Sequence, residues 1–374
     1  MKRTLTQAIM TLAFLTTTIC LQAQVTIGST EAPIQGALLD LKESGTTTKG
    51  LGLPRVKLTA MNDITNGDIT GVTATNADDH IGLLIYHIGE QACESIPSGI
   101  YVWDGEQWQA IGQTIDGYMF TDSRDGESYW AGSFGAAGDW MLENLRYLPT
   151  TADFTHTAAV STTNKYYCYP MKGALFATYN PTQAQADWEA QWGLLYNWQA
   201  ATNGENASIL NEGQGQLNEG PATPIQGICP SGWHLPSDKE WNELEKVLTE
   251  SADQYASGSY TSADKTWQSA WETTSGARGN TQGIVMKSIC KPSGSTTETG
   301  GESFPVYRSG FNAILLGMAD DNRCEEFGRS AYFWSSSSLA TNSAWGRVIG
   351  YDYDMGIKHS YLRRGLGSVR CKKD

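Results

Sequence analysis

The stretch ICPSGWHLPSDKEW, residues 228–241, places a cysteine, two prolines, a glycine and two tryptophans directly ahead of an amphipathic segment. Its prolines and glycine favour a rigid, irregular loop. Ser237 and Glu240 have the spacing of a capping box, in which each side chain bonds the backbone N–H of the other residue. Apolar residues then recur at helical spacing to about Leu248. The stretch therefore predicts a loop that begins at Cys229 and leads into a helix, and it has the character of a fold nucleus.

The composition restricts the classes of function. The chain has 374 residues, enough for two domains or one elaborate domain, and its formal net charge is −14. A chain this acidic lacks the excess of positive charge that attracts nucleic acid or an anionic membrane surface. Its 40 glycines, 13 tryptophans and 17 tyrosines indicate a loop-rich fold with aromatic anchors, and not a helical bundle.

The N-terminal segment has the features of an export signal. Lys2 and Arg3 precede an apolar run that is too short to span a bilayer, and a plausible cleavage point lies before Gln24. We therefore expect residues 1–23 to be removed and the mature chain to be exported, to the cell surface, the outer membrane or the medium. Lipidation at Cys20 stays open as an alternative. The sequence contains no second apolar stretch long enough to form a transmembrane segment.

The mature chain would keep an even number of cysteines, which in an exported protein favours disulfides. Sequence alone does not choose among the pairings. No C-x-x-C pair occurs, so the simplest zinc and thioredoxin-like sites are excluded. The disulfide candidates are Cys93, Cys168, Cys229, Cys290, Cys324 and Cys371.

The region between residues 24 and 112 differs from the later part of the chain and has the pattern of a small β-rich module. Its strongest signal is an Asp-Gly turn between two aromatic strands in Tyr101–Trp108, which predicts a hairpin. Together with Ala37–Leu41 and Gly82–Tyr86, this hairpin resembles the N-terminal region of many exported proteins of the Bacteroidetes. The resemblance implies a presentation module without enzymatic activity.

Residues 113–374 form a second unit of short β-like pieces, long loops and few helices. Its motifs, in chain order, resemble the Fibrobacter succinogenes major paralogous domain: W-M-L-E-N-L at 140–145, Y-Y-C-Y at 166–169, L-Y-N-W-Q-A at 195–200, the opening stretch, G-F-N-A at 310–313, F-W-S-S-S at 333–337 and S-V-R-C at 368–371. That family implies an exported domain of the cell envelope without a defined biochemical role. It is distantly similar to C-type-lectin-like and formylglycine-generating-enzyme folds, which implies an α+β fold.

With the family in view, we expect Cys229 to pair with Cys371, which would tie the opening loop to the last strand. No catalytic constellation stands out. The serines after Trp334 lack the flanking glycines of a nucleophile elbow, and the histidines have no helical metal spacing. We interpret His234 as a packed residue that hydrogen-bonds a loop carbonyl. A formylglycine-generating-type enzyme stays open as an alternative, and it requires two free thiols that lie close together.

Two acidic clusters are candidates for a calcium site, because calcium prefers oxygen ligands. One comprises Asp320, Asp321 and Asn322 with Glu325, and the other comprises Asp352 and Asp354. In an acidic protein such clusters also occur simply as solvated loop charges. Solvated loop charges are the favoured interpretation, so we expect no cofactor; calcium held by Asp320, Asp321 and Glu325 stays open as an alternative.

Aromatic residues on late loops are the other binding candidates. Trp334 and Trp345 can stack on sugar rings or anchor a protein partner if they face solvent. The sequence therefore predicts an exported, non-catalytic surface protein that binds a glycan or a protein, as an adhesin or an assembly component. A purely structural envelope component is a further alternative. Neither the ligand nor the oligomeric state follows from the sequence.

Overall fold

The computed structural model describes residues 25–27, 39–41, 50–65, 69, 71–73, 75–89, 96–205 and 224–374. The chain divides into two compact units, Met1–Leu53 and Pro54–Asp374. In the first unit, β1 (Val25–Ile27) and β2 (Leu39–Leu41) pair in parallel, with Val25 opposite Leu39. The predicted signal segment, Cys20 and Cys93 lie outside the described residues. None of the helices in the described parts has the length and apolar character needed to cross a membrane.

The predicted hairpin is confirmed within a four-stranded sheet. Asp104 accepts hydrogen bonds from the backbone N–H groups of Glu106 and Gln107, at 2.8 and 2.7 Å, and Trp103 packs against Trp108 across the strands. A short 3₁₀ helix, Ala77–His80, precedes the second strand. The strands lie in the order β3 (Arg55–Val56), β4 (Leu84–His87), β5 (Gly99–Trp103) and β6 (Trp108–Ile111).

A five-stranded sheet joins the opening stretch to the last residues of the chain. Trp233 lies opposite Lys373, and Lys372 lies opposite Trp140. The expected disulfide between Cys229 and Cys371 is confirmed beside this pairing. The sheet runs in the order β14 (Trp233–His234), β22 (Lys372–Lys373), β9 (Asp139–Met141), β8 (Ser128–Ser133) and β7 (Tyr118–Thr121), and the 3₁₀ turn Gly135–Ala137 links β8 to β9.

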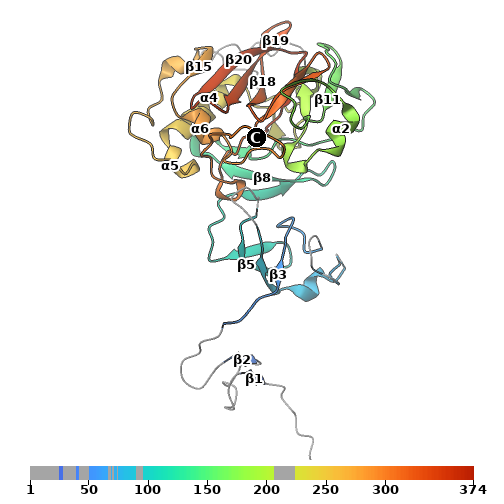
Figure 1. The fold of residues 1–374 in the computed structure, drawn as a ribbon, viewed down its shortest axis with the longest axis vertical. Helices are drawn as coiled ribbons and strands as arrows, with labels where there is room; N and C mark the ends of the chain where they lie inside the picture. Colours follow the sequence, from blue (N-terminus) through green and yellow to red (C-terminus); the bar gives the residue numbers. More distant parts are fainter. Residues whose placement is uncertain are drawn as a thin grey trace, which may run out of the picture. The chain divides into compact units, whose positions relative to one another are not determined.

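The largest sheet has eleven strands, and Figure 1 shows β18, β19 and β20 as its neighbouring late strands. β17 (Arg323–Phe327) lies beside β16 and also pairs with β12 (Phe176–Thr178). Asp321 and Asn322 join β16 to β17 with φ values of 49° and 59°, the left-handed pair of a tight hairpin turn. The main path is β10 (Phe154–His156), β11 (Lys165–Cys168), β13 (Leu195–Asn197), β21 (Leu366–Ser368), β16 (Leu316–Asp320), β18 (Ser330–Ala340), β19 (Ser343–Gly350), β20 (Gly356–Leu362) and β15 (Gly276–Arg278).

The helices are short apart from α4 (Asp238–Glu250), which follows the opening stretch as predicted. Its capping box is present, since Ser237 accepts from the Glu240 N–H and Glu240 accepts from the Ser237 N–H. The other helices are α2 (Pro181–Ala186), α3 (Trp198–Ala201), α5 (Ala252–Tyr255), α6 (Gln282–Met286) and the 3₁₀ turns Ala190–Trp192, Ser269–Glu272 and Val306–Arg308. Few helices and many short strands confirm the mixed α and β class.

The side chain of Trp241 lies at the centre of the core that α4 covers. Its ring contacts Trp140, Phe311 and Phe333, with ring centroids 5.0, 5.9 and 5.6 Å away. Its indole N–H donates to the Trp334 carbonyl oxygen at 3.2 Å. The helix predicted from the opening stretch therefore packs directly on β18, and this contact helps to hold the late strands in position.

The helical spacing of Trp192, Leu195 and Tyr196 predicts a short helix over residues 192–201, and this prediction is wrong for residues 195–197. The structure forms β13 over Leu195–Asn197 and only then the short α3. Asn197 explains the change, because its side-chain oxygen accepts both from the Ala200 N–H, as a helix cap, and from the Tyr166 N–H of β11. Pairing with distant strands outweighs the local helical pattern here.

Candidate functional site

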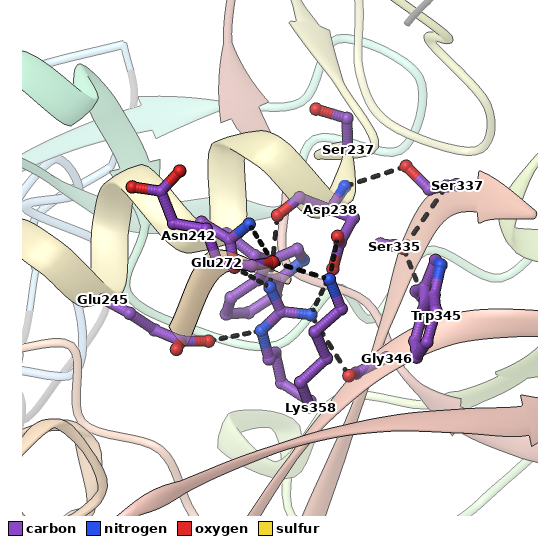
Figure 2. A network of polar contacts seen from close by, with 12 residues as sticks. Ser237, Asp238, Asn242, Glu245, Glu272, Ser335, Ser337, Trp345, Gly346 and Lys358 are labelled. Atoms are coloured by element: carbon purple, nitrogen blue, oxygen red, sulfur yellow. Dashed lines mark hydrogen bonds and ion pairs between the residues drawn. The ribbon is translucent and has the colours of Figure 1, made fainter. Parts of the chain in front are cut away.

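A buried network of charges joins the first turns of α4 to β19 and β20. Arg347 donates to an Asp238 carboxylate oxygen at 2.8 Å and also contacts Glu245. Lys358 pairs with the other oxygen of Asp238, and Arg278 donates to Glu245 at 2.8 Å. Figure 2 shows Lys358 directed at Asp238, with Asn242 and Glu245 on successive turns of the same helix. The negative end of each pair comes from α4, and the positive ends come from the sheet.

The charge balance of this network suits a structural role. Burial alone would raise the pKa of Asp238, but Arg347 and Lys358 outweigh it and hold the pKa below its usual value. Burial lowers the pKa of Lys358 to about 8 against the opposing effect of Asp238. All of these side chains are nearly inaccessible to solvent. The network ties α4 to β15, β19 and β20.

His234 is packed, as the sequence predicted, but its ring nitrogens bond two carboxylate groups and not the expected loop carbonyl. One ring nitrogen lies 2.9 Å from a Glu240 carboxylate oxygen and the other lies 2.7 Å from an Asp374 carboxylate oxygen. Burial would lower the pKa of His234, but these two carboxylates raise it above the usual 6.5. Lys372 bonds the same Glu240 oxygen at 2.8 Å. The opening loop is therefore held by the end of the chain.

The opposite face of β18–β20 carries a groove with aromatic walls. The Tyr361 ring packs against Tyr332, Trp334 and His359, with centroids 5.3, 6.2 and 4.6 Å away. Small residues occupy the strand between these rings, since Gly346 pairs with both Trp334 and His359. We name this surface the aromatic groove; it is lined by Met318, Tyr332, Trp334, Tyr361, Leu362 and residues 365–367.

The aromatic groove is shallow and almost entirely apolar. Its enclosed volume is only about 10 Å³, far below the roughly 300–1,000 Å³ of ligand pockets, so it is an apolar surface depression and not a cavity. Leu362 is exposed in its lining, while Tyr332 and Tyr361 are partly buried; His359 is exposed and packs on Tyr361 but does not itself line the groove. Burial and then the nearby Glu326 raise the pKa of Tyr332 to about 12, so its hydroxyl group stays protonated.

The two tryptophans predicted to bind ligands are both buried. Trp334 is 3% exposed and lines the aromatic groove, but its N–H is bonded to the Tyr196 carbonyl oxygen. Trp345 is 2% exposed and faces the buried charge network, with the Lys358 ammonium 4.6 Å from its ring. Neither ring face is free for a ligand, because Trp334 packs into the core and Trp345 lies on the α4 side of the sheet.

The acidic candidates lie in two hairpin turns. Asp321 and Asn322 form the exposed turn between β16 and β17, and Asp320 is bonded to Arg364 at 3.2 Å. Asp352 and Asp354 are exposed between β19 and β20. Burial and then Asp320 raise the pKa of Glu325. Among the described residues, no three His, Cys, Asp or Glu side chains are grouped to hold a metal ion. The candidate calcium ligands therefore gain no support from the geometry.

The cysteines differ from the expectation that all six are bonded. Cys290 is disulfide-bonded, as are Cys229 and Cys371. Cys168 and Cys324 instead carry free, buried thiol groups, and these two groups are in contact. They satisfy the requirement of the enzyme alternative for two close, free thiols. With exposures of 0% and 3%, however, they have no opening through which a protein substrate could reach them.

Of the residues that line the aromatic groove, only Trp334 was identified from the sequence. Tyr332 and Trp334 alternate along β18 with Phe333, which hints that both tyrosine and tryptophan share a face. That hint does not reveal which residues of β19 and β20 lie beside them. His359 and Tyr361 enter the site only through the strand register.

The comparisons with known proteins agree with the motifs. Residues 136–373 match the model of the Fibrobacter succinogenes major domain, and residues 26–128 match a phage tail-like trimerisation region. No curated protein and no solved structure matches the chain. The first match covers well over half of the 374 residues and confirms the family that the ordered motifs predicted. The chain therefore belongs to the Fibrobacter succinogenes major domain family.

Proposed function

We propose that this chain is an exported, non-catalytic surface protein that binds a neutral saccharide ring in the aromatic groove. The observation that carries the proposal is the grouping of Tyr332, His359 and Tyr361 around small residues on one sheet face. Aromatic rings arranged in this way present flat, apolar surfaces with polar edges. The matched family, whose members are typically exported, supports the surface location.

The electrostatic surroundings favour a neutral ligand. The formal net charge is −14, and Glu326 lies close enough to the groove to influence the pKa of both Tyr332 and Tyr361. An anionic sugar would be repelled by this field, whereas hydroxyl groups of a neutral sugar can donate to carboxylates and accept from tyrosines. The groove is too shallow to enclose a sugar, so in this proposal a ring stacks on its exposed edge at Leu362.

The N-terminal region supports a multimeric arrangement of such sites. Its match to a phage tail-like trimerisation region supports a proposal in which three copies assemble through it. Large apolar side chains are exposed in this region, at Ile27, Leu39, Leu41, Leu51, Ile81, Leu84, Tyr86 and Ile111. A partner copy would remove them from water. Three grooves on one particle would raise the avidity for a glycan-coated surface even if each site were weak.

A glycan array on the mature chain tests the proposal, with and without added calcium. We expect binding to neutral glycans that Leu362→Glu and His359→Ala each weaken by at least about tenfold, equivalent to about 1.4 kcal/mol. Both positions are exposed, so both variants keep the fold. Phe176→Ala removes an exposed aromatic residue from β12, outside both the aromatic groove and the matched trimerisation region, and serves as the matched control.

The proposal fails if no glycan binds above background in either condition, or if the groove variants bind as tightly as the parent chain. A pull-down with the same variants then distinguishes a protein partner. Capture that depends on Leu362 would move the ligand class from glycan to protein and leave the site in place. Capture that depends on neither groove position would remove the site.

A further inference from the structure

The curvature of the eleven-stranded sheet brings two distant cysteines together. Cys168 of β11 lies opposite Leu195 of β13, and Cys324 of β17 lies opposite Ala319 of β16. Ala319 in turn lies opposite Leu366 of β21, the strand that also pairs with β13. Directly opposed residues share a sheet face, so both thiols point to the same side. All five residues belong to one small buried cluster.

The two thiol groups are partners of each other within this cluster. Burial and then the hydrogen bond with Cys324 raise the pKa of Cys168 well above its usual value. The residues around them are small and apolar, among them Ala158, Ala174 and Ala319. The site therefore holds two neutral sulfur atoms side by side, and it lacks the cationic environment that keeps a reactive cysteine ionised.

We propose that Cys168 and Cys324 form a disulfide when the chain folds in an oxidising compartment. Both thiols lose their protons and a sulfur–sulfur bond forms. The two electrons reduce a disulfide-type oxidant, either a small-molecule disulfide or a dithiol oxidoreductase, to two thiols. Exchange proceeds through a thiolate, which the folded cluster disfavours. The bond is therefore made before β12 and β17 close over Cys168, and the finished fold protects it from reductants.

The bridge would reinforce the curled end of the sheet. β11 and β17 are not neighbours in the sheet order, so their connection now depends on the strands between them and on packing. A covalent link between residues this far apart in sequence restricts the unfolded chain strongly. We expect the oxidised form to melt on the order of 5–15 °C above a Cys168→Ala/Cys324→Ala variant.

Peptide mapping without reduction tests the proposal on the full-length chain. The chain is purified from a periplasm and, separately, from a reducing cytosol, and free thiols are alkylated in guanidinium before digestion. We expect the periplasmic chain to yield a linked peptide pair that contains Cys168 and Cys324. The cytosolic chain should carry alkyl groups on both residues. Oxidation of the cytosolic chain by glutathione disulfide should proceed much faster in denaturant than in the folded state.

The Cys229–Cys371 pair gives the internal control, because its linked peptide shows in the same digest that the chain was oxidised. Alkylation of Cys168 and Cys324 beside an intact Cys229–Cys371 link would overturn the proposal, as would linkage of either residue to another cysteine. The mapping uses the unaltered sequence, so it decides the question even if the alanine variant fails to fold.

Discussion

The Glu240 side chain makes three separate interactions. It closes the capping box of α4, it accepts from His234, and it pairs with Lys372 near the end of the chain. Burial alone would raise the pKa of Glu240, but its bonds to His234 and Lys372 lower the pKa from 4.5 to about 2. A carboxyl group with a lowered pKa stabilises the fold above its unfolded pKa, and this contribution disappears as the pH falls towards 2.

We therefore predict that Glu240→Gln lowers the free energy of unfolding at pH 7 by about 3 kcal/mol, from a shift of about 2.5 pKa units. The difference between the variant and the parent chain should narrow between pH 4.5 and pH 2, because the parent loses the same contribution there. Urea denaturation of both chains across this pH range measures the difference in their free energies of unfolding. Glu250→Gln, at an exposed position on the same helix, is the control and should change the free energy of unfolding little. A constant difference at all pH values would contradict the linkage.

A second prediction at the residue scale concerns Arg347 of the buried charge network, whose replacement should lower the free energy of unfolding. Arg347→Met leaves Asp238 and Glu245 buried without a full set of partners, so we expect a loss of about 3–5 kcal/mol. Arg364→Met removes the partly exposed pair with Asp320 and should cost about 0–1 kcal/mol. Chemical denaturation of both variants measures the contrast. Similar losses in the two variants would show that the network contributes no more than a surface pair.

At the scale of elements, two asparagine residues cap helices, and we predict that their replacement by alanine lowers the stability of the fold by different amounts. Asn180 caps α2 at an exposed position, and its replacement by alanine should cost about 1 kcal/mol. Asn197 caps α3 but also bonds Tyr166, Ser161 and Asn164 while fully buried. Asn197→Ala leaves several buried backbone groups unpaired, so we expect about 3 kcal/mol. Thermal melting of the two variants compares them, and equal shifts would mean that the bonds beyond the cap are unimportant.

Elements with local causes were predictable from the sequence. The capping box at Ser237 and the turn at Asp104 depend on residues within a few positions, and both formed as predicted. The helix predicted over residues 192–201 is wrong for residues 195–197 because Asn197 takes its partners from distant segments. The aromatic groove was missed for the same reason. Its walls come from β18 and β20, and only the pairing through Gly346 places them together.

At the scale of the whole molecule, the match to a trimerisation region predicts that the particle in solution has the mass of three chains. Light scattering coupled to gel filtration should give three copies of the full chain. Leu84→Lys places a charge on an exposed apolar residue of that region and should reduce the mass to one copy. Leu148→Lys changes a similarly exposed leucine outside the region and should leave the mass unchanged. A single-copy parent chain would contradict the assembly.

The contacts of residues 371–374 also decide when the opening stretch can be completed during synthesis. Cys371 bonds Cys229, Lys372 bonds Glu240, and the Asp374 N–H donates to the Gly232 carbonyl oxygen. The disulfide joins residues 142 positions apart, so the ribosome makes these partners long after the opening stretch itself. The loop ahead of α4 therefore reaches its final state only once residues 371–374 have emerged from the ribosome.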